Sequence, residues 1–145
     1  MGGPPPELGR QQCIHGDYQD GNVIFDDNDG VAAILDWDAL NQASRAYEVM
    51  RAFNFSFPEG APGGLDFLRG YVNAARPSPE DAATLVDVWS YTILQRFWPV
   101  DARYEQPGSY QERWDVFIRE PSGWWEGNRE RMRQELIRFA KAARA

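Results

Sequence analysis

The order of apolar and polar residues predicts a β-hairpin in the N-terminal third of the chain. Two short apolar runs, at 23–25 and 31–35, flank the turn-forming residues Asp26-Asp27-Asn28-Asp29-Gly30. Short apolar runs around an Asn, Asp and Gly turn are typical of two antiparallel strands. We therefore predict a two-stranded β-hairpin over residues 23–36.

Beyond the hairpin, apolar residues recur every three or four positions, which is typical of amphipathic helices. This spacing covers the segments around 46–57 and 65–75. Ser78-Pro79-Glu80-Asp81 predicts a third helix start, because it supplies a capping hydroxyl, a first-turn proline and two acids at the positive end of the helix dipole. The apolar face expected for this third helix is Ala82, Leu85, Val86, Trp89, Ile93 and Phe97.

The last part of the chain predicts two more helices, one over 109–119 and one from about Asn128 to the end. Pro121-Ser122-Gly123 predicts a loop between them, and this loop would carry Trp124 and Trp125. Most aromatic residues of this region are expected to pack in the core. One of the two loop tryptophans is instead a candidate to line a substrate cleft.

Together these elements predict an α+β, mostly helical chain with a single folded domain. The length of 145 residues fits one domain, and a hydrophobic content of 43% predicts a packed core. Residues 1–12 are rich in Pro and Gly and are expected to form a flexible lead-in. The domain itself is expected to span 13–145, with a β-rich part at 13–44 and a helical part at 45–145.

Composition excludes several classes of protein. The net charge of -7 argues against binding to nucleic acid. A single cysteine, Cys13, excludes an internal disulfide, and a single histidine, His15, excludes a multi-histidine metal site. No apolar run approaches the roughly 18 residues of a membrane span, and the N-terminus does not resemble a secretory signal. We therefore expect a cytoplasmic protein that binds neither nucleic acid nor membranes.

The segment from Cys13 to Ser44 contains seven Asp but no Lys or Arg. Asp17 and Asn22 lie five residues apart before the first strand, and a hairpin would fold Asp36 back beside Asn22. Two carboxylates ~6 Å apart repel by roughly 3 kcal/mol at an effective dielectric constant of about 20. The segment is therefore either a well-solvated acidic turn or an all-oxygen site for a cation such as Mg²⁺.

The motif His15-Gly16-Asp17, followed after four residues by Asn22, and the motif Ile34-Leu35-Asp36-Trp37-Asp38 together resemble the aminoglycoside phosphotransferase family. This family of small-molecule kinases is built like protein kinases and includes choline kinase relatives. The resemblance is closest over 13–53. It implies a protein-kinase-like C-terminal lobe, with the catalytic loop and metal hairpin at 13–44 and a helical subdomain at 45–145.

The resemblance also implies roles for the loop residues. Asp17 would be the catalytic base for a substrate hydroxyl, and Asn22 and Asp36 would hold the Mg²⁺ ions that bridge the phosphates of ATP. His15 would be structural, joining the loop to the strand that carries Asp36. Glu48 stands where many relatives have Asp, and it is a candidate to brace the loop.

Two further acids and one aromatic residue of this segment have weaker assignments. Asp20 and Asp38 are candidates for substrate or outer-shell contacts, although a solvated position explains both equally simply. Trp37 is expected to serve packing rather than chemistry.

The chain departs from the family in one respect. Relatives place a Gly-rich loop, a strand lysine and a helix glutamate before the His-Gly-Asp motif, whereas only 14 residues precede His15 here and the one lysine is Lys141. We expect the ATP-binding lobe to be missing from this chain. It would then be a fragment of a longer enzyme, a remnant, or one half of a two-chain enzyme.

The resulting hypothesis is the catalytic lobe of an ATP-dependent phosphotransferase that acts on a small-molecule hydroxyl and is inactive or weak alone. The acidic charge is compatible with an amine-bearing substrate, although bound Mg²⁺ explains the same acids. The alternative is a non-catalytic kinase-lobe remnant that acts as a binding or assembly module. Apolar surface left by the missing lobe predicts self-association in either case.

Overall fold

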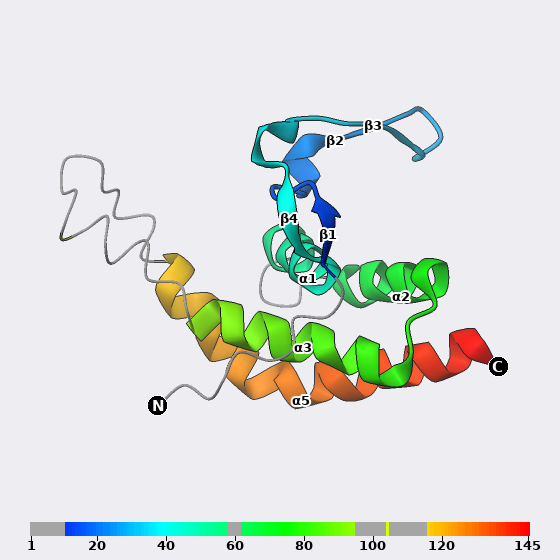
Figure 1. The fold of residues 1–145 in the computed structure, drawn as a ribbon, viewed down its shortest axis with the longest axis vertical. Coiled ribbons are helices and arrows are strands. Elements are labelled where there is room, and N and C mark those ends of the chain that lie inside the picture. The colour runs from blue at the N-terminus through cyan, green and yellow to red at the C-terminus, as the bar shows by residue number, and fades with distance from the viewer. Residues whose placement is uncertain (1–10, 58–61, 95–103, 105–115) are drawn as a thin grey trace.

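The computed structural model describes residues 11–57, 62–94, 104 and 116–145, and the fold is built from two small sheets and a layer of helices (Figure 1). The strands and helices are β1 (Gln11–Ile14), β2 (Val23–Phe25), β3 (Val31–Ile34), β4 (Asn41–Ser44), α1 (Arg45–Ser56), α2 (Gly64–Ala75), α3 (Pro79–Leu94) and α5 (Val116–Arg144). Two short 3₁₀ turns, η1 (Asp20–Asn22) and η2 (Trp37–Ala39), lie in the β-rich part. The α+β, mostly helical character expected from the sequence is confirmed for this part of the chain.

The hairpin predicted over 23–36 is present, because β2 and β3 pair antiparallel with Val23 opposite Ile34. A second antiparallel pair, β1 with β4, was not predicted, and it places Ile14 opposite Asn41. β1 begins at Gln11, so the ordered strand extends two residues into the segment assigned to the flexible lead-in. The rest of that segment lies outside the described residues.

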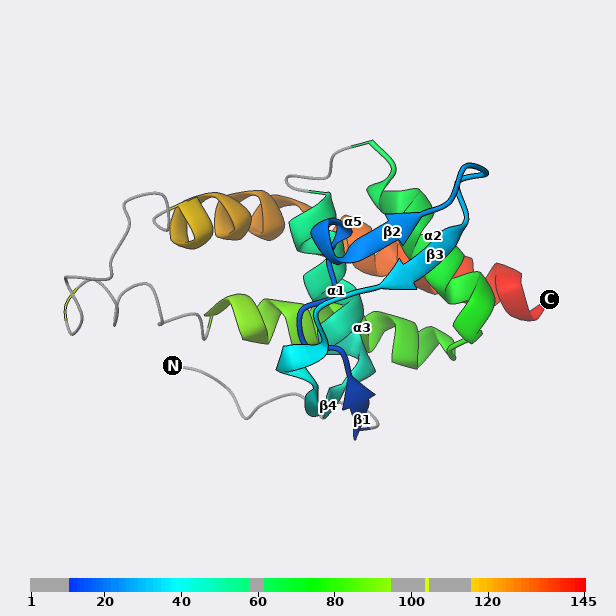
Figure 2. The ribbon, with the colours of Figure 1, turned by 90° about the horizontal axis from the view of Figure 1, so that it is seen from above.

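The core lies among the helices, where α1 and α2 sit above the pair α3 and α5 (Figures 1 and 2). Helices α1, α2 and α3 occur where apolar spacing predicted them. Their inward side chains join those of α5 in one buried cluster, composed of Val49, Met50, Phe53, Leu68, Val72, Ala82, Leu85, Val86, Trp89, Trp125, Met132, Leu136, Phe139 and Ala140. Phe97, expected on the same face, lies outside the described residues.

The loop predicted at Pro121-Ser122-Gly123 is wrong, because α5 runs without interruption from Val116 to Arg144. The helix start predicted near Asn128 is wrong for the same reason, and the one predicted over 109–119 falls mostly outside the described residues. A helix with one Pro and two Gly is weakened by about 5 kcal/mol in intrinsic propensity. Burying a tryptophan side chain contributes about 4–6 kcal/mol of stability, which offsets this cost. Trp125 of α5 is only 4% exposed and lies in the core.

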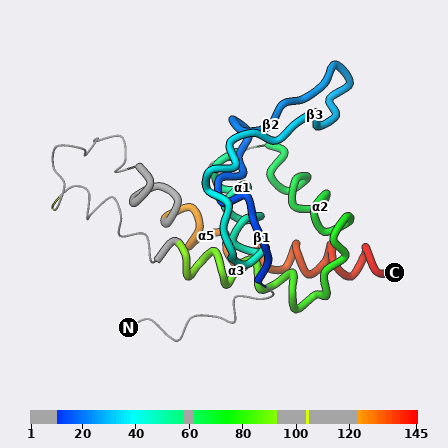
Figure 3. The backbone as a smooth tube through the Cα atoms, turned by 45° about the horizontal axis from the view of Figure 1, so that its top comes forward, coloured from blue at the N-terminus to red at the C-terminus, as the bar shows by residue number. Residues whose placement is uncertain are grey.

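The hairpin β2–β3 projects away from α3 and α5, as the backbone tube shows (Figure 3). Large apolar side chains are exposed on the hairpin and on the segment that follows it, namely Ile24, Phe25, Val31, Leu35, Trp37 and Leu40. No helix in the described part of the chain is long and apolar enough to cross a membrane.

Candidate active site

The loop that joins β1 to β2 passes very close to η2, and glycine at position 16 allows this approach. Gly16 has a φ of +81°, in the left-handed region. A Cβ atom added there would lie 2.2 Å from the main-chain oxygen of Ala39 and 2.6 Å from the side-chain nitrogen of Asn41. The backbone position of the loop therefore depends on the absence of a side chain at residue 16.

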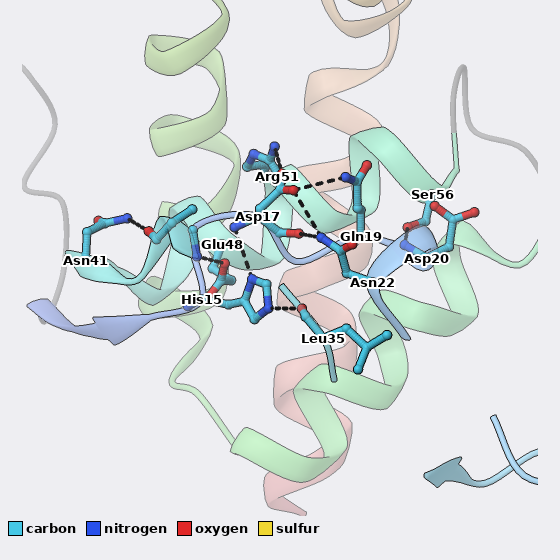
Figure 4. A network of polar contacts seen from close by, with 12 residues as sticks. His15, Asp17, Gln19, Asp20, Asn22, Leu35, Asn41, Glu48, Arg51 and Ser56 are labelled. Atoms are coloured by element: carbon cyan, nitrogen blue, oxygen red, sulfur yellow. Dashed lines mark hydrogen bonds and ion pairs between the residues drawn. The ribbon is translucent and has the colours of Figure 1, made fainter. Parts of the chain in front are cut away.

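Glu48 on α1 fixes the start of this loop. One carboxylate oxygen accepts a hydrogen bond from the His15 main-chain N–H at 2.6 Å, and the other accepts from the Gly16 N–H at 2.9 Å (Figure 4). Helix α1 itself begins beside the end of β4, where the Ser44 hydroxyl accepts a hydrogen bond from the Tyr47 N–H at 3.1 Å. Glu48 thus ties the loop to the first turn of a well-capped helix.

His15 connects the loop to the end of β3. The ring is buried, with 4% exposure, and its Nε2 lies 2.7 Å from the Leu35 carbonyl oxygen. Its Nδ1 accepts a hydrogen bond from the Asp17 main-chain N–H at 3.2 Å. A neutral ring that carries its hydrogen on Nε2 satisfies both contacts. The Trp37 ring packs against it with the ring centroids 4.6 Å apart.

Asp17 lies at the centre of the polar network in Figure 4. Its Oδ1 is paired with the Arg51 guanidinium. Its Oδ2 accepts hydrogen bonds from the side-chain nitrogens of Asn22 at 3.0 Å and Gln19 at 3.2 Å. An ionised carboxylate offers about four acceptor positions. Described residues occupy three of them, which leaves one for an incoming hydroxyl group.

Asn22 is oriented by its amide nitrogen, which also donates to the Asp17 main-chain oxygen at 2.8 Å. The amide oxygen therefore points away from these contacts, and no described residue engages it. The Asn22 main-chain oxygen accepts a hydrogen bond from the Leu35 N–H at 2.9 Å. The hairpin register thus brings Asp36, the next residue after Leu35, to the same end of the hairpin as Asn22.

Asp36 adopts a left-handed backbone conformation, with φ 60° and ψ 64°, and is exposed. Within the described residues, no hydrogen bond or ion pair engages its carboxylate. No group of three or more His, Cys, Asp or Glu side chains that could hold a metal occurs in this described region. The Asn22 amide oxygen and the Asp36 carboxylate, both at this end of the hairpin, are engaged by no other described residue.

The weaker candidates lie at the edge of this network or away from it. The main-chain N–H of Asp20 donates to the Ser56 hydroxyl at 3.1 Å, and the residue itself is exposed, as is Asp38. Trp124 and Trp125 lie within helix α5, so the prediction that a loop carries them is wrong. Trp125 is buried and its Nε1–H donates to the Ser90 hydroxyl at 2.8 Å, whereas Trp124 is half-buried beside Phe53.

Arg51 is a site residue that sequence reasoning missed. Its guanidinium pairs with Asp17 and lies 4.5 Å from the centroid of the Phe55 ring, and its side chain is 16% exposed. Its position three residues after Glu48, on the same helix face, was the available signal. Arg51 supplies the positive charge that the acidic segment itself lacks.

The loop lies within the part of the chain that matches the model of a known protein family. The model of the phosphotransferase enzyme family matches residues 3–83, more than half of the chain, and the match includes every residue of the network in Figure 4. No curated protein and no solved structure matches the chain.

Proposed function

Because the chain belongs to the phosphotransferase enzyme family, we propose that it is the C-terminal catalytic lobe of an ATP-dependent small-molecule kinase. The reaction would transfer the γ-phosphoryl group of Mg-ATP to a substrate hydroxyl. The proposal depends chiefly on the Asp17 carboxylate, which Arg51, Asn22 and Gln19 hold in place with one acceptor position left.

The residues at the hairpin end fit a magnesium ion. Mg²⁺ takes oxygen ligands and is usually bound by one or two protein groups, with phosphate and water completing its shell. The Asn22 amide oxygen and the Asp36 carboxylate provide such a pair, and neither is engaged by another described residue. When bound, the metal would neutralise charge on the transferred phosphoryl group.

Asp17 would accept the proton of the substrate hydroxyl and orient its oxygen toward the phosphoryl group. His15 and Glu48 would act indirectly, by fixing the loop that carries Asp17. His15 joins it to Leu35 and therefore to the position of Asp36, and Glu48 joins it to α1. A kinase-like lobe would require a catalytic loop that is fixed in this way. Positioning of the reacting groups before reaction is the main source of catalysis in phosphoryl transfer.

The single lysine of the sequence is Lys141, in the last turn of α5. The sequence therefore has no lysine near the loop to contact the phosphates of ATP. We expect the chain alone to be inactive or weak, with the remaining phosphate contacts supplied by additional polypeptide.

A binding or assembly module is the second candidate, and the exposed apolar side chains of the hairpin favour it. Phe25 and Val31 are each 57% exposed, and Trp37 is 51% exposed. Apolar surface of this kind promotes association. Sedimentation should then detect dimers or larger species, which Phe25→Ser combined with Val31→Ser would dissociate. A monomeric wild-type chain would contradict self-association.

The catalytic proposal is tested by incubating the chain with Mg-ATP and separate sugars, amino-alcohols and aminoglycosides, and by detecting phosphorylated product by mass spectrometry. The proposal predicts slow transfer to one class, lost in Asp17→Asn. Rapid turnover would contradict the requirement for additional polypeptide. Transfer that persists in Asp17→Asn would contradict the role of Asp17.

A further inference from the structure

A cavity of about 310 Å³ lies between α1, the beginning of α2 and α5. It is lined by Phe53, Asp66, Arg69, Trp124, Arg131 and Met132, among others. None of its lining residues belongs to the loop at 15–22 or to the hairpin, so the cavity is separate from the candidate active site. Its volume is at the lower end of the range for small-molecule sites.

One wall of the cavity is aromatic and firmly held. Phe53 and Met132 are at most 2% exposed and belong to the core. Trp124 is half-buried, with its ring centroid 6.4 Å from that of Phe53 and 6.2 Å from that of Trp125. Rigid aromatic surfaces of this kind favour flat apolar ligands, which lose little freedom when they stack.

The polar lining carries more positive than negative charge. Arg69 pairs with Asp66 at 3.1 Å. Both side chains are more than half exposed, so the attraction between the two charges is weak. Arg131 is exposed and has no ion-pair partner among the described residues. The described lining of the cavity therefore has an excess of positive charge in a chain whose net charge is -7.

A guanidinium that no described residue pairs, beside an aromatic wall, indicates the chemistry of the ligand. The planar fork of arginine binds carboxylates through two parallel hydrogen bonds. The ring and the carboxylate of one small molecule could then contact Trp124 and Arg131 at the same time. The volume has room for roughly one or two fused rings with a short acidic arm.

From these contacts we propose that the cavity binds a small aromatic carboxylate, with the ring against Trp124 and the carboxylate on Arg131. The site does not depend on phosphoryl transfer, because neither residue belongs to the polar network around Asp17. It would persist if the chain proved to be a non-catalytic module.

Calorimetric titration with indole-3-acetate as the probe tests the proposal, with indole-3-acetamide as its neutral counterpart. The acid should bind about tenfold more tightly than the amide, since a hydrogen bond to a charged group contributes that much or more. Arg131→Gln should abolish this preference. Arg129→Gln is the matched control, because it removes the same charge from an exposed position two residues away on α5.

A second measurement locates the ligand. The indole N–H signal of Trp124, assigned by its loss in Trp124→Phe, should shift during titration with the acid. No measurable binding of the acid would overturn the proposal. Equal binding of acid and amide, or equal loss in Arg129→Gln and Arg131→Gln, would overturn it as well, because each would show that Arg131 does not recognise the carboxylate.

Discussion

Replacement of Glu48 by glutamine tests whether this side chain holds the catalytic loop. In the wild type its two carboxylate oxygens accept hydrogen bonds from the main-chain N–H groups of His15 and Gly16. Glutamine keeps one acceptor, but its NH₂ group would face the other N–H donor. The variant therefore loses one hydrogen bond and the charge that strengthens the second.

The expected loss of stability follows from the two hydrogen bonds that Glu48 accepts. A hydrogen bond to a charged group contributes about 1.5–3 kcal/mol, and a neutral one contributes about 1 kcal/mol. Loss of one charged bond and weakening of the other should lower the free energy of unfolding of Glu48→Gln by about 2–5 kcal/mol. For a chain of this size, such a change lowers the melting temperature by roughly 4–20 °C.

Urea denaturation followed by tryptophan fluorescence measures the change, and the amide signals of His15 and Gly16 report the loop directly. Glu126→Gln is the control, because Glu126 is exposed on α5 and its replacement should change stability by at most about 0.5 kcal/mol. If Glu48→Gln matched this control in stability and left both amide signals unchanged, the loop would not depend on Glu48.

Three further predictions follow from the same contacts. Gly16→Ala should lower the free energy of unfolding by about 2 kcal/mol or more, measured by urea denaturation, because its Cβ would meet the Ala39 oxygen at 2.2 Å and φ is positive; wild-type stability would refute this. Asp87→Asn should cost about 1 kcal/mol in the same assay, because it breaks the pair with Arg133 that joins α3 to α5, and no change would show that the pair is dispensable. Burial raises the pKa of Tyr71 above its ordinary value, against a lowering by Arg45. Tyr71 therefore ionises more readily in the unfolded chain, and stability should fall as pH rises above about 10; Tyr71→Phe should reduce this fall, and an unchanged pH profile would contradict it.

The hairpin and three helices could be predicted because their signals are local. Alternation around an Asp-rich turn specifies β2 and β3, and apolar spacing with the cap at Ser78 specifies α3. The pairing of β1 with β4 was missed because it joins residues about 30 positions apart, and neither strand alternates clearly. Local signals also failed in α5, where Pro121 predicted a break that the burial of Trp125 overrides.

In the candidate site too, some residues could be predicted from local sequence, whereas others depend on packing between distant elements. The motif from His15 to Asn22 identified the loop, and the hairpin register explains why Asp36 lies at its end. Arg51 could not be predicted from the motif, because its role arises from the packing of α1 against the loop. The cavity beside Trp124 could not be predicted for a similar reason, since α5 is distant in sequence from α1 and α2, which line its other side.

In the proposed function, Asn22 and Asp36 together bind a divalent ion with a polyphosphate. Titration with Mn²⁺ and ATP, followed by paramagnetic broadening of amide signals, tests it directly. Metal binding at these residues predicts the strongest broadening at Asn22 and Asp36, and its loss in Asp36→Asn. Broadening centred on the acidic turn at Asp26–Asp29, or unchanged in Asp36→Asn, would contradict it.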